Sequence, residues 1–229
     1  MRRFLAVVFA LCLLPLPVRA AEAADTEEDA YVVLTFDDGP SGRFTRALLD
    51  GLSERGVHAT FLLCGYRIAQ SPELTEAIYA AGHEIGLHGY SHKCMENLCP
   101  AEIEREIADT LALLPAGCRP VFLRPPGGIS GASVRAAAEQ AGLSILNWSV
   151  DPRDWATHDA ASVERAVLKN VKDGDVILLH DMSDSSTEAA LFIVDALQKR
   201  GFHFVTASQL AALRGIELTP GKTYRRFSG

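Results

Sequence analysis

Short apolar runs alternate with longer amphipathic stretches along the chain from position 31 onward. The runs are rich in β-branched and aromatic residues and have the length of strands, whereas the longer stretches repeat apolar residues at helical spacing. The runs cover 31–36, 58–63, 83–87, 121–125, 144–148, 175–180 and 203–206, and the longer stretches include 43–55, 72–81, 100–114 and 131–141. Strands that alternate with helices pair in parallel, because a parallel neighbour needs a crossover connection.

This alternation predicts a single α/β domain over residues 31–229, built as a distorted (β/α)7-type barrel of parallel strands. No glycine-rich phosphate-binding motif follows any of the runs, which argues against an open nucleotide-binding sheet. No repeat or low-complexity segment divides the region. A chain of 229 residues with 48% hydrophobic composition has enough apolar material to fill one such core.

The first twenty residues have the pattern of a secretory signal peptide. Arg2 and Arg3 precede an apolar run over 4–16, and Val18-Arg19-Ala20 suits cleavage after residue 20. The run is short for a membrane span, so we expect export by a Sec-type signal to the exterior or the cell envelope, without a stable membrane anchor. A retained anchor is the alternative. Residues 21–30 are acidic and lack large apolar side chains, which predicts a disordered lead-in.

Charge and cysteines restrict the partners and the redox state. Loss of residues 1–20 removes three arginines and no acid, which moves the formal net charge from −7 to −10. An acidic protein is expected to bind nucleic acid poorly, because the phosphate groups bind to a basic surface. Export permits disulfides. Cys94 and Cys99 lie in one predicted loop and either form a local bridge or stay as thiols, whereas we expect Cys118 to be free and the protein to be a monomer.

Titratable side chains gather directly after the predicted strands. The carboxyl ends of parallel strands share one edge of a barrel, and active sites of such folds form there. The residues at these ends are Asp37, Asp38, His88, His92, Arg124, Asp151, Asp154, His180 and Asp181. Scattered surface charge would not follow the strand ends, so this edge is the candidate site.

Asp37 and Asp38 are adjacent at the end of the first strand. Successive strand residues face opposite sides, so we expect the two carboxylates to point in different directions, which allows one to bind a metal while the other serves as a base. An Asp-Gly turn in which Asp38 caps the next helix is the alternative for this motif alone.

His88 and His92 are four residues apart, so one helical turn or a tight loop would place both imidazoles on one side. Two histidines and a carboxylate leave coordination positions open for water and substrate, as hydrolysis at a divalent ion requires. A pair of surface histidines is the alternative. His180 ends an apolar strand, and an ordinary pKa near 6.5 suits it to proton donation, unless it is a structural histidine bonded to Asp181.

Five short motifs follow these strand ends in order: TFDDGP at 35–40, HGYSH at 88–92, RPPGG at 124–128, DPRDW at 151–155 and LLH at 178–180. Together they resemble the NodB-homology polysaccharide deacetylases, carbohydrate esterase family 4, over roughly residues 31–213. The resemblance implies a secreted, metal-dependent hydrolase that removes N-acetyl groups from N-acetylated sugars of a cell-wall polysaccharide, peptidoglycan or chitin-like, and releases acetate.

The resemblance also implies a role for each motif residue. Asp38, His88 and His92 would bind one divalent ion, with zinc as the first choice and cobalt or nickel as alternatives. Asp37 would be the base, kept ionised by Arg124. The remaining roles are proton donation by His180, orientation of that histidine by Asp154, oxyanion stabilisation by the N–H of Gly127, and an acetyl pocket walled by Trp155 and Leu178.

Three positions depart from the family pattern. Gly89 stands where Ser or Thr is usual, which predicts the loss of a hydrogen bond that braces the loop. Gly127 replaces an aromatic residue, which keeps the N–H but opens the groove, and His58 replaces a basic residue. None is a metal ligand, base or acid. The alternative functions are hydrolysis of another N-acyl or cyclic amide, and carbohydrate binding by an inactive homologue.

Overall fold

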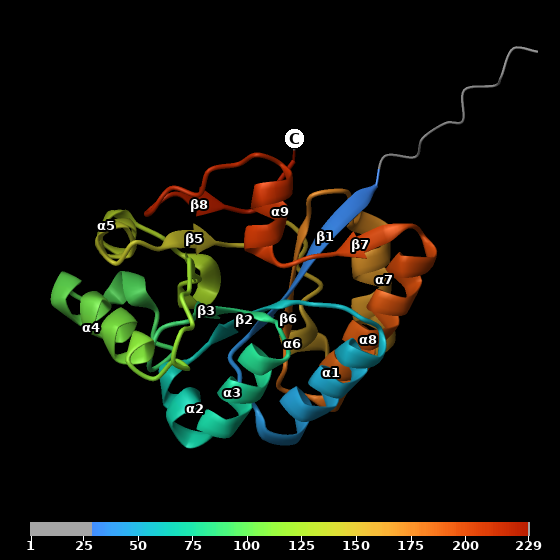
Figure 1. Ribbon diagram of the computed structural model, residues 1–229, viewed down its shortest axis with the longest axis horizontal. Helices are drawn as coiled ribbons and strands as arrows, with labels where there is room; N and C mark the ends of the chain where they lie inside the picture. Colours follow the sequence, from blue (N-terminus) through green and yellow to red (C-terminus); the bar gives the residue numbers. More distant parts are fainter. Residues whose placement is uncertain (1–28, 229) are drawn as a thin grey trace, which may run out of the picture.

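The computed structural model describes residues 29–228, which form one α/β domain (Figure 1). The strands are β1 (Ala30–Asp37), β2 (Thr60–Leu63), β3 (Glu84–Leu87), β4 (Phe122–Leu123), β5 (Ser144–Leu146), β6 (Val176–His180), β7 (Phe202–Phe204) and β8 (Thr223–Tyr224). The helices are α1 (Gly42–Glu54), α2 (Gly65–Gln70), α3 (Pro72–Ala80), α4 (Pro100–Leu111), α5 (Ala132–Gln140), α6 (Asp154–Thr157), α7 (Ala160–Asn170), α8 (Asp184–Lys199) and α9 (Ala207–Leu213), with short 3₁₀ turns at Met95–Asn97 and Pro126–Gly128. The expected signal peptide, and the expected lead-in up to residue 28, lie outside the described residues.

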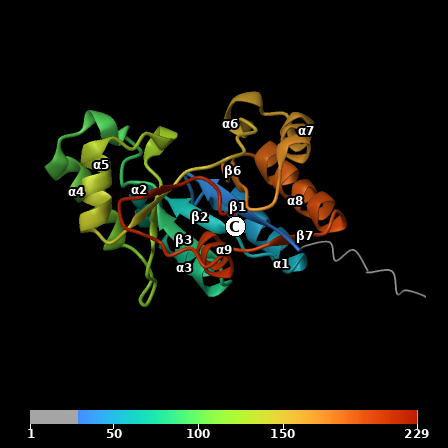
Figure 2. The ribbon, with the colours of Figure 1, turned by 90° about the horizontal axis from the view of Figure 1, so that it is seen from above.

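The strands form one curled parallel sheet in the order β6-β1-β2-β3-β4-β5-β8, and β7 also pairs with β1. Figure 2 shows β6, β1, β2 and β3 near the centre of the molecule. Isolated bridges from Val150 to Ile177 and from Asp175 to Arg226 connect the two margins of the sheet. The curled sheet has the form of a half-barrel and confirms the predicted α/β class with parallel strands. Each of the seven predicted strands is present. Strand β8 was not predicted, because two residues are too short to give a recognisable run.

Alternate residues of β1 face two different cores. Val32, Leu34 and Phe36 are fully buried on the outer face, in a cluster that includes side chains of α1, α7 and α8. A second outer cluster joins β3, β4 and β5 to α4 and α5. Figures 1 and 2 accordingly place α1, α7 and α8 at one edge of the sheet and α4 with α5 at the other.

The inner face of the sheet changes character along the strands. Val33 belongs to an apolar cluster in which α9 and the segment around Phe227 cover the inner face of the sheet. Thr35 and Asp37 follow on the same face, and the parallel register places Leu178 beside Thr35 and His180 beside Asp37. The inner face is therefore apolar at the amino ends of the strands and ionisable at their carboxyl ends.

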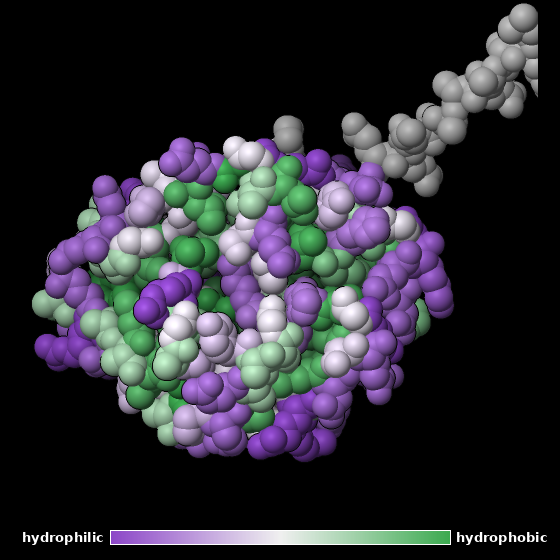
Figure 3. All heavy atoms as spheres, in the orientation of Figure 1, coloured by the Kyte–Doolittle hydropathy of each residue, from purple (hydrophilic) through white to green (hydrophobic). Residues whose placement is uncertain are grey.

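The outer surface is mostly polar over the helices. Figure 3 shows charged and polar side chains over the helices at both edges of the molecule, with apolar side chains between them. Among the described residues, no helix has both the length and the apolar character needed to cross a membrane. The four cysteines of residues 29–228 are free thiols, which is the second of the two alternatives for Cys94 and Cys99.

Candidate functional site

A cavity of about 330 Å³ opens at the carboxyl ends of the strands. Eight of the ten expected site residues line it, together with Trp148 and Asp151. The lining residues are Asp37, Asp38, His88, His92, Gly127, Trp148, Asp151, Trp155, Leu178 and His180. The other two expected residues, Arg124 and Asp154, are buried and contact lining residues by hydrogen bonds.

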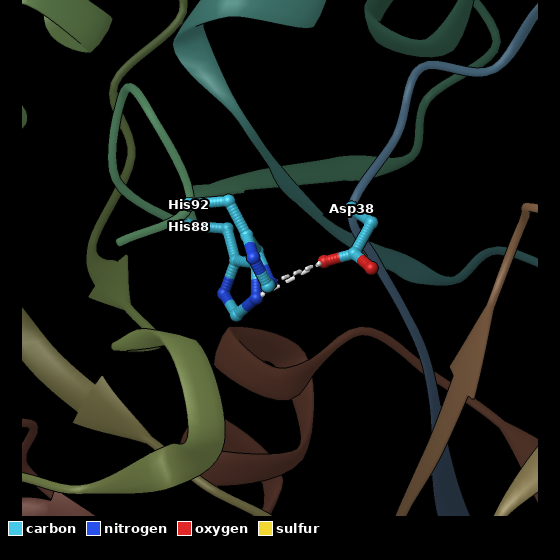
Figure 4. A group of neighbouring side chains, drawn as sticks. All are labelled: Asp38, His88 and His92. Atoms are coloured by element: carbon cyan, nitrogen blue, oxygen red, sulfur yellow. Dashed lines mark ion pairs between the residues drawn. The ribbon is translucent and has the colours of Figure 1, made fainter. Parts of the chain in front are cut away.

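Asp38, His88 and His92 form a potential metal-binding group. One ligand atom from each lies within 4.8 Å of the others, and Figure 4 shows both imidazoles directed at the Asp38 carboxylate. Asp38 Oδ1 lies 3.3 Å from His88 Nε2 and 3.0 Å from His92 Nε2. Asp38 Oδ1 is buried, but its contacts with the two histidines do not have hydrogen-bond geometry, so it has no hydrogen-bond partner among the described residues. Two imidazole nitrogens and a carboxylate oxygen that converge in this way fit a divalent cation.

Backbone conformation directs two of these ligands. Asp38 has a φ of 73° and His92 a φ of 59°, values in the left-handed region that non-glycine residues seldom occupy. The turn at Asp38 explains why both adjacent aspartates line the same cavity, although strand alternation predicted that they would point in different directions. His92 lies in a tight loop after β3, which is one of the two local structures that the spacing allowed.

The orientation of His88 is set by a hydrogen bond on its other nitrogen. His88 Nδ1 lies 2.7 Å from the backbone carbonyl oxygen of Arg124. A carbonyl oxygen only accepts, so Nδ1 carries a hydrogen, and Nε2 is the nitrogen that faces Asp38. Metal-binding histidines generally have their ring oriented by such a second partner.

The charge state of the ligands favours cation binding. Burial raises the pKa of Asp38, but its contacts with His88 and His92 outweigh burial and hold that pKa well below the usual range. The carboxylate is therefore anionic at neutral pH. Asp38 in turn raises the pKa of His92, so protons compete with a cation for this imidazole.

Asp37 is paired with a fully buried arginine. The Arg124 guanidinium donates to Asp37 Oδ1 at 2.6 Å, to Thr35 Oγ1 at 2.8 Å, and to the carbonyl oxygens of Leu146 and Asn147 at 2.7 and 3.1 Å. Asp37 Oδ2 is left toward the cavity, 3.8 Å from His88 Nε2. One oxygen of this carboxylate is thus fixed while the other faces the metal-binding group.

His180 is held by Asp154 and not by Asp181. Asp154 Oδ1 lies 2.9 Å from His180 Nδ1, while Oδ2 accepts from the His180 backbone N–H and from the Ser186 hydroxyl. Burial lowers the pKa of His180, but the hydrogen bond to Asp154 and the nearby carboxylates outweigh it and raise the pKa to about 9. The imidazole is therefore protonated at neutral pH, as a proton donor needs to be.

Asp181 faces a different environment. It accepts a hydrogen bond from the Thr45 hydroxyl, and its second oxygen has no hydrogen-bond partner among the described residues. Burial raises the pKa of Asp181 to about 7. The alternative in which Asp181 anchors a structural His180 is therefore wrong.

Aromatic and glycine residues shape the open side of the cavity. Trp155 is 53% exposed, whereas Leu178 is 3% exposed at the cavity floor. Gly127 has a φ of 74°, and a Cβ added there would meet no atom within 4 Å. The groove is open at this position, as the absence of a side chain predicted. Because φ is positive, any side chain at this position would also strain the backbone.

Sequence reasoning gave no role to two residues that shape the site. Trp148 lies two residues after the end of β5, but the search of the strand ends was for titratable side chains and so passed over it. Glu106 lies in α4 and contacts the loop between His88 and His92. No local pattern marks it, because it is one of several acids on that helix. His58, the third departure from the family pattern, packs against His83 just before β2. The side-chain partners of Asp154 in the described residues are His180 and Ser186, so His58 is not one of them.

Comparisons with known proteins find one family. The family model for polysaccharide deacetylase matches residues 24–146. A peptidoglycan-N-acetylglucosamine deacetylase of Bacillus cereus is 38% identical over 80% of this chain and 88% of its own length. A chitooligosaccharide deacetylase of Bradyrhizobium is 34% identical over 81% of this chain and 93% of its own. Longer relatives match as well, and the chain spans 44% of one from Listeria monocytogenes.

A solved structure shares the fold. It is a family 4 acetyl xylan esterase from Clostridium thermocellum in complex with a cobalt ion. It superposes with a TM-score of 0.80 at 34% identity, over 86% of this chain and 98% of that one.

Proposed function

Because the chain belongs to the NodB-homology polysaccharide deacetylases of carbohydrate esterase family 4, we propose that it is a secreted, metal-dependent hydrolase of N-acetylated glycans. It would cleave the acetamide C–N bond and release acetate and a free amine. The observation that carries the proposal is the cavity that contains the potential metal ligands, a fixed carboxylate and a protonated imidazole. Export and cell-wall location rest on the signal-peptide pattern of residues 1–20 and on the relatives named above.

Asp38, His88 and His92 would hold the divalent ion, with zinc as the first choice and cobalt as an alternative that the esterase structure supports. A divalent ion at such a site polarises an acetyl carbonyl and lowers the pKa of water. Asp38 contributes negative charge, and the hydrogen bond from His88 Nδ1 fixes the ring for binding through Nε2.

Asp37 is the proposed base. Arg124 holds Oδ1, so Oδ2 is free to take a proton from the water that attacks the acetyl carbon.

His180 is the proposed acid. Its position beside Asp37 in the β1–β6 register supports this proposal, because the two side chains come from neighbouring strands and line the same cavity. As the C–N bond breaks, the imidazolium gives a proton to the departing nitrogen, and Asp154 keeps the ring oriented. Leu178 and Trp155 would contact the acetyl methyl group, and the Gly127 N–H would donate to the oxygen that gains negative charge.

Acetate release from a panel of N-acetylated glycans tests the proposal. The panel contains peptidoglycan and chitin oligomers, and a small cyclic amide is assayed beside it by loss of its ring amide, because its hydrolysis releases no acetate. Each substrate is assayed with metal-stripped and zinc-reloaded protein. We expect activity on the glycans after reloading and a loss of about 10²- to 10⁴-fold in Asp37→Asn, because an amide cannot accept the proton. Acetate release by the stripped protein, or full activity in Asp37→Asn, would exclude this mechanism. Activity on the cyclic amide alone would favour the alternative hydrolase.

A further inference from the structure

The loop between the two histidines depends on a side chain from another element. The backbone N–H groups of Tyr90 and Ser91 donate to Glu106 Oε2 at 2.6 and 2.7 Å. The Ser91 hydroxyl donates to Glu106 Oε1 at 2.6 Å. Both oxygens of one half-buried carboxylate therefore accept hydrogen bonds from Tyr90 and Ser91, two of the three residues that separate His88 from His92.

The opposite side of the same loop is fixed by α2. The backbone N–H groups of Gly65 and Tyr66 donate to the carbonyl oxygens of Gly89 and Tyr90, each at 2.9 Å. The loop is thus clamped between the first residues of α2, which satisfy its carbonyl groups, and Glu106, which satisfies its N–H groups. Without Glu106, the structure offers these two N–H groups no partner among the described residues.

Gly89 makes room for this contact. Its φ is 74°, and a Cβ at this position would lie 2.9 Å from Met95 Cε and 3.2 Å from Glu106 Oε2. A larger residue here would press on the carboxylate that braces the loop. Gly89 has no side chain to brace the loop, and the side-chain hydrogen bonds to Tyr90 and Ser91 come from Glu106 of α4.

We propose that Glu106 is a positioning residue for metal binding, which holds the His88–His92 loop so that both imidazoles meet Asp38. Hydrogen bonds to a carboxylate are about twice as strong as those between neutral groups, so this acid orders the loop better than a hydroxyl would. Ordering the loop before the cation arrives removes part of the entropy cost of binding. The inference rests on the metal-binding part of the proposed function.

The test is the zinc dissociation constant, measured by competition with a chromophoric chelator and independent of catalysis. Partners that orient metal ligands usually contribute about 10- to 100-fold in affinity, and we expect Glu106→Ala to weaken zinc binding by that factor. Glu106→Gln keeps the shape and one carbonyl oxygen, so it should recover part of the affinity. Ser91→Ala removes one of the three hydrogen bonds and should lie close to the unmodified protein.

Glu104→Gln is the matched control. Glu104 is an exposed acid of the same helix, and its side chain has no hydrogen bond or ion pair among the described residues. The zinc affinity of the Glu104→Gln protein should therefore equal that of the unmodified protein. The melting temperature of each metal-free variant separates metal binding from folding. If Glu106→Ala fails to fold, Glu106→Gln carries the test, and a partial loss of zinc affinity is the expected result.

The possible results are distinct. A weakened affinity in Glu106→Ala, with a metal-free melting temperature near that of the unmodified protein, supports the inference. Unchanged affinity in Glu106→Ala and Glu106→Gln overturns it, as does an equal loss in Glu104→Gln. If the unmodified protein binds no zinc, cobalt or nickel, the metal-binding part of the proposed function fails instead.

Discussion

Replacement of Arg124 by Met tests the ion pair at the centre of the site. Arg124 is fully buried and donates four hydrogen bonds, one of them to Asp37, which is 3% exposed. Met fills a similar volume but leaves the Asp37 carboxylate buried without its counter-charge. Breaking a buried pair in this way usually costs about 3–5 kcal/mol. We expect a fall of that size in the free energy of unfolding, and loss of activity because the base is no longer fixed.

A double-mutant cycle isolates the pair from the rest of the arginine's contacts. Asp37→Asn keeps an oxygen that can accept from Arg124 but leaves the buried guanidinium without its counter-charge, so we expect a cost near the lower end of the same range, about 3 kcal/mol. In Arg124→Met/Asp37→Asn the uncompensated carboxylate is gone. The double variant should therefore be more stable than the sum of the single losses predicts, by about 1–3 kcal/mol.

Urea unfolding of the metal-free proteins measures these differences without a contribution from bound ions. Arg119→Met is the control, since Arg119 is exposed and donates to the neighbouring carbonyl of Cys118, and its effect should stay within about 0.5 kcal/mol. A loss in Arg124→Met no larger than in the control would refute the reasoning. Strict additivity in the cycle would place the cost in the carbonyl contacts of Arg124 and not in its pair with Asp37.

Three further predictions concern single groups. Asp154→Asn removes the strongest of the interactions that raise the pKa of His180 to about 9, so the alkaline limb of kcat/KM should move to lower pH; an unmoved limb would mean that another group donates the proton. Burial raises the pKa of Asp181 from 3.8 to about 7, so the folded state favours the protonated acid. Its contribution to the free energy of unfolding is therefore fully present below the unfolded pKa and is lost as pH rises through 7. Melting temperatures at about pH 5 and about pH 8 should therefore differ less in Asp181→Asn, and equal pH dependence would contradict this. Gly127→Ala should lower the free energy of unfolding by about 1 kcal/mol despite the empty space, because φ is positive, and unchanged urea unfolding would contradict the strain.

The sequence predicted the strands because their apolar positions are consistent with both faces of the sheet being buried. In β1 the outer residues meet the helices and Val33 meets the inner cluster, so the run contains no exposed position that would break the pattern. The same logic located the site, since Asp37 and His180 end two such runs. Strand β8 was not predicted, because Thr223 and Tyr224 form a strand by pairing with β5 and are too few to show an apolar pattern in the sequence.

Contacts between distant elements could not be predicted in this way. The direction of Asp38 depends on a left-handed turn that an Asp-Gly pair permits but does not require. The contact of Glu106 with Tyr90 and Ser91 depends on where α4 packs, and its sequence separation of 15 and 16 residues leaves no periodic signal. Helical spacing describes which side of α4 is apolar, but not which loop its remaining acids reach.

The two halves of the site differ in how firmly they are held. The side of the site that contains Asp37 is closed to solvent, with Arg124 at 0% and Asp37 at 3% exposure, and each is fixed by the other. The opposite side is open, because the His92 side chain is 45% exposed and Trp155 is 53% exposed. We therefore expect a glycan to approach across His92 and Trp155, with most of its contacts on the side held by the loop. It follows that changes in sugar preference should map to this open rim and to Gly127, while changes around Arg124 should alter the rate and the stability of the fold together.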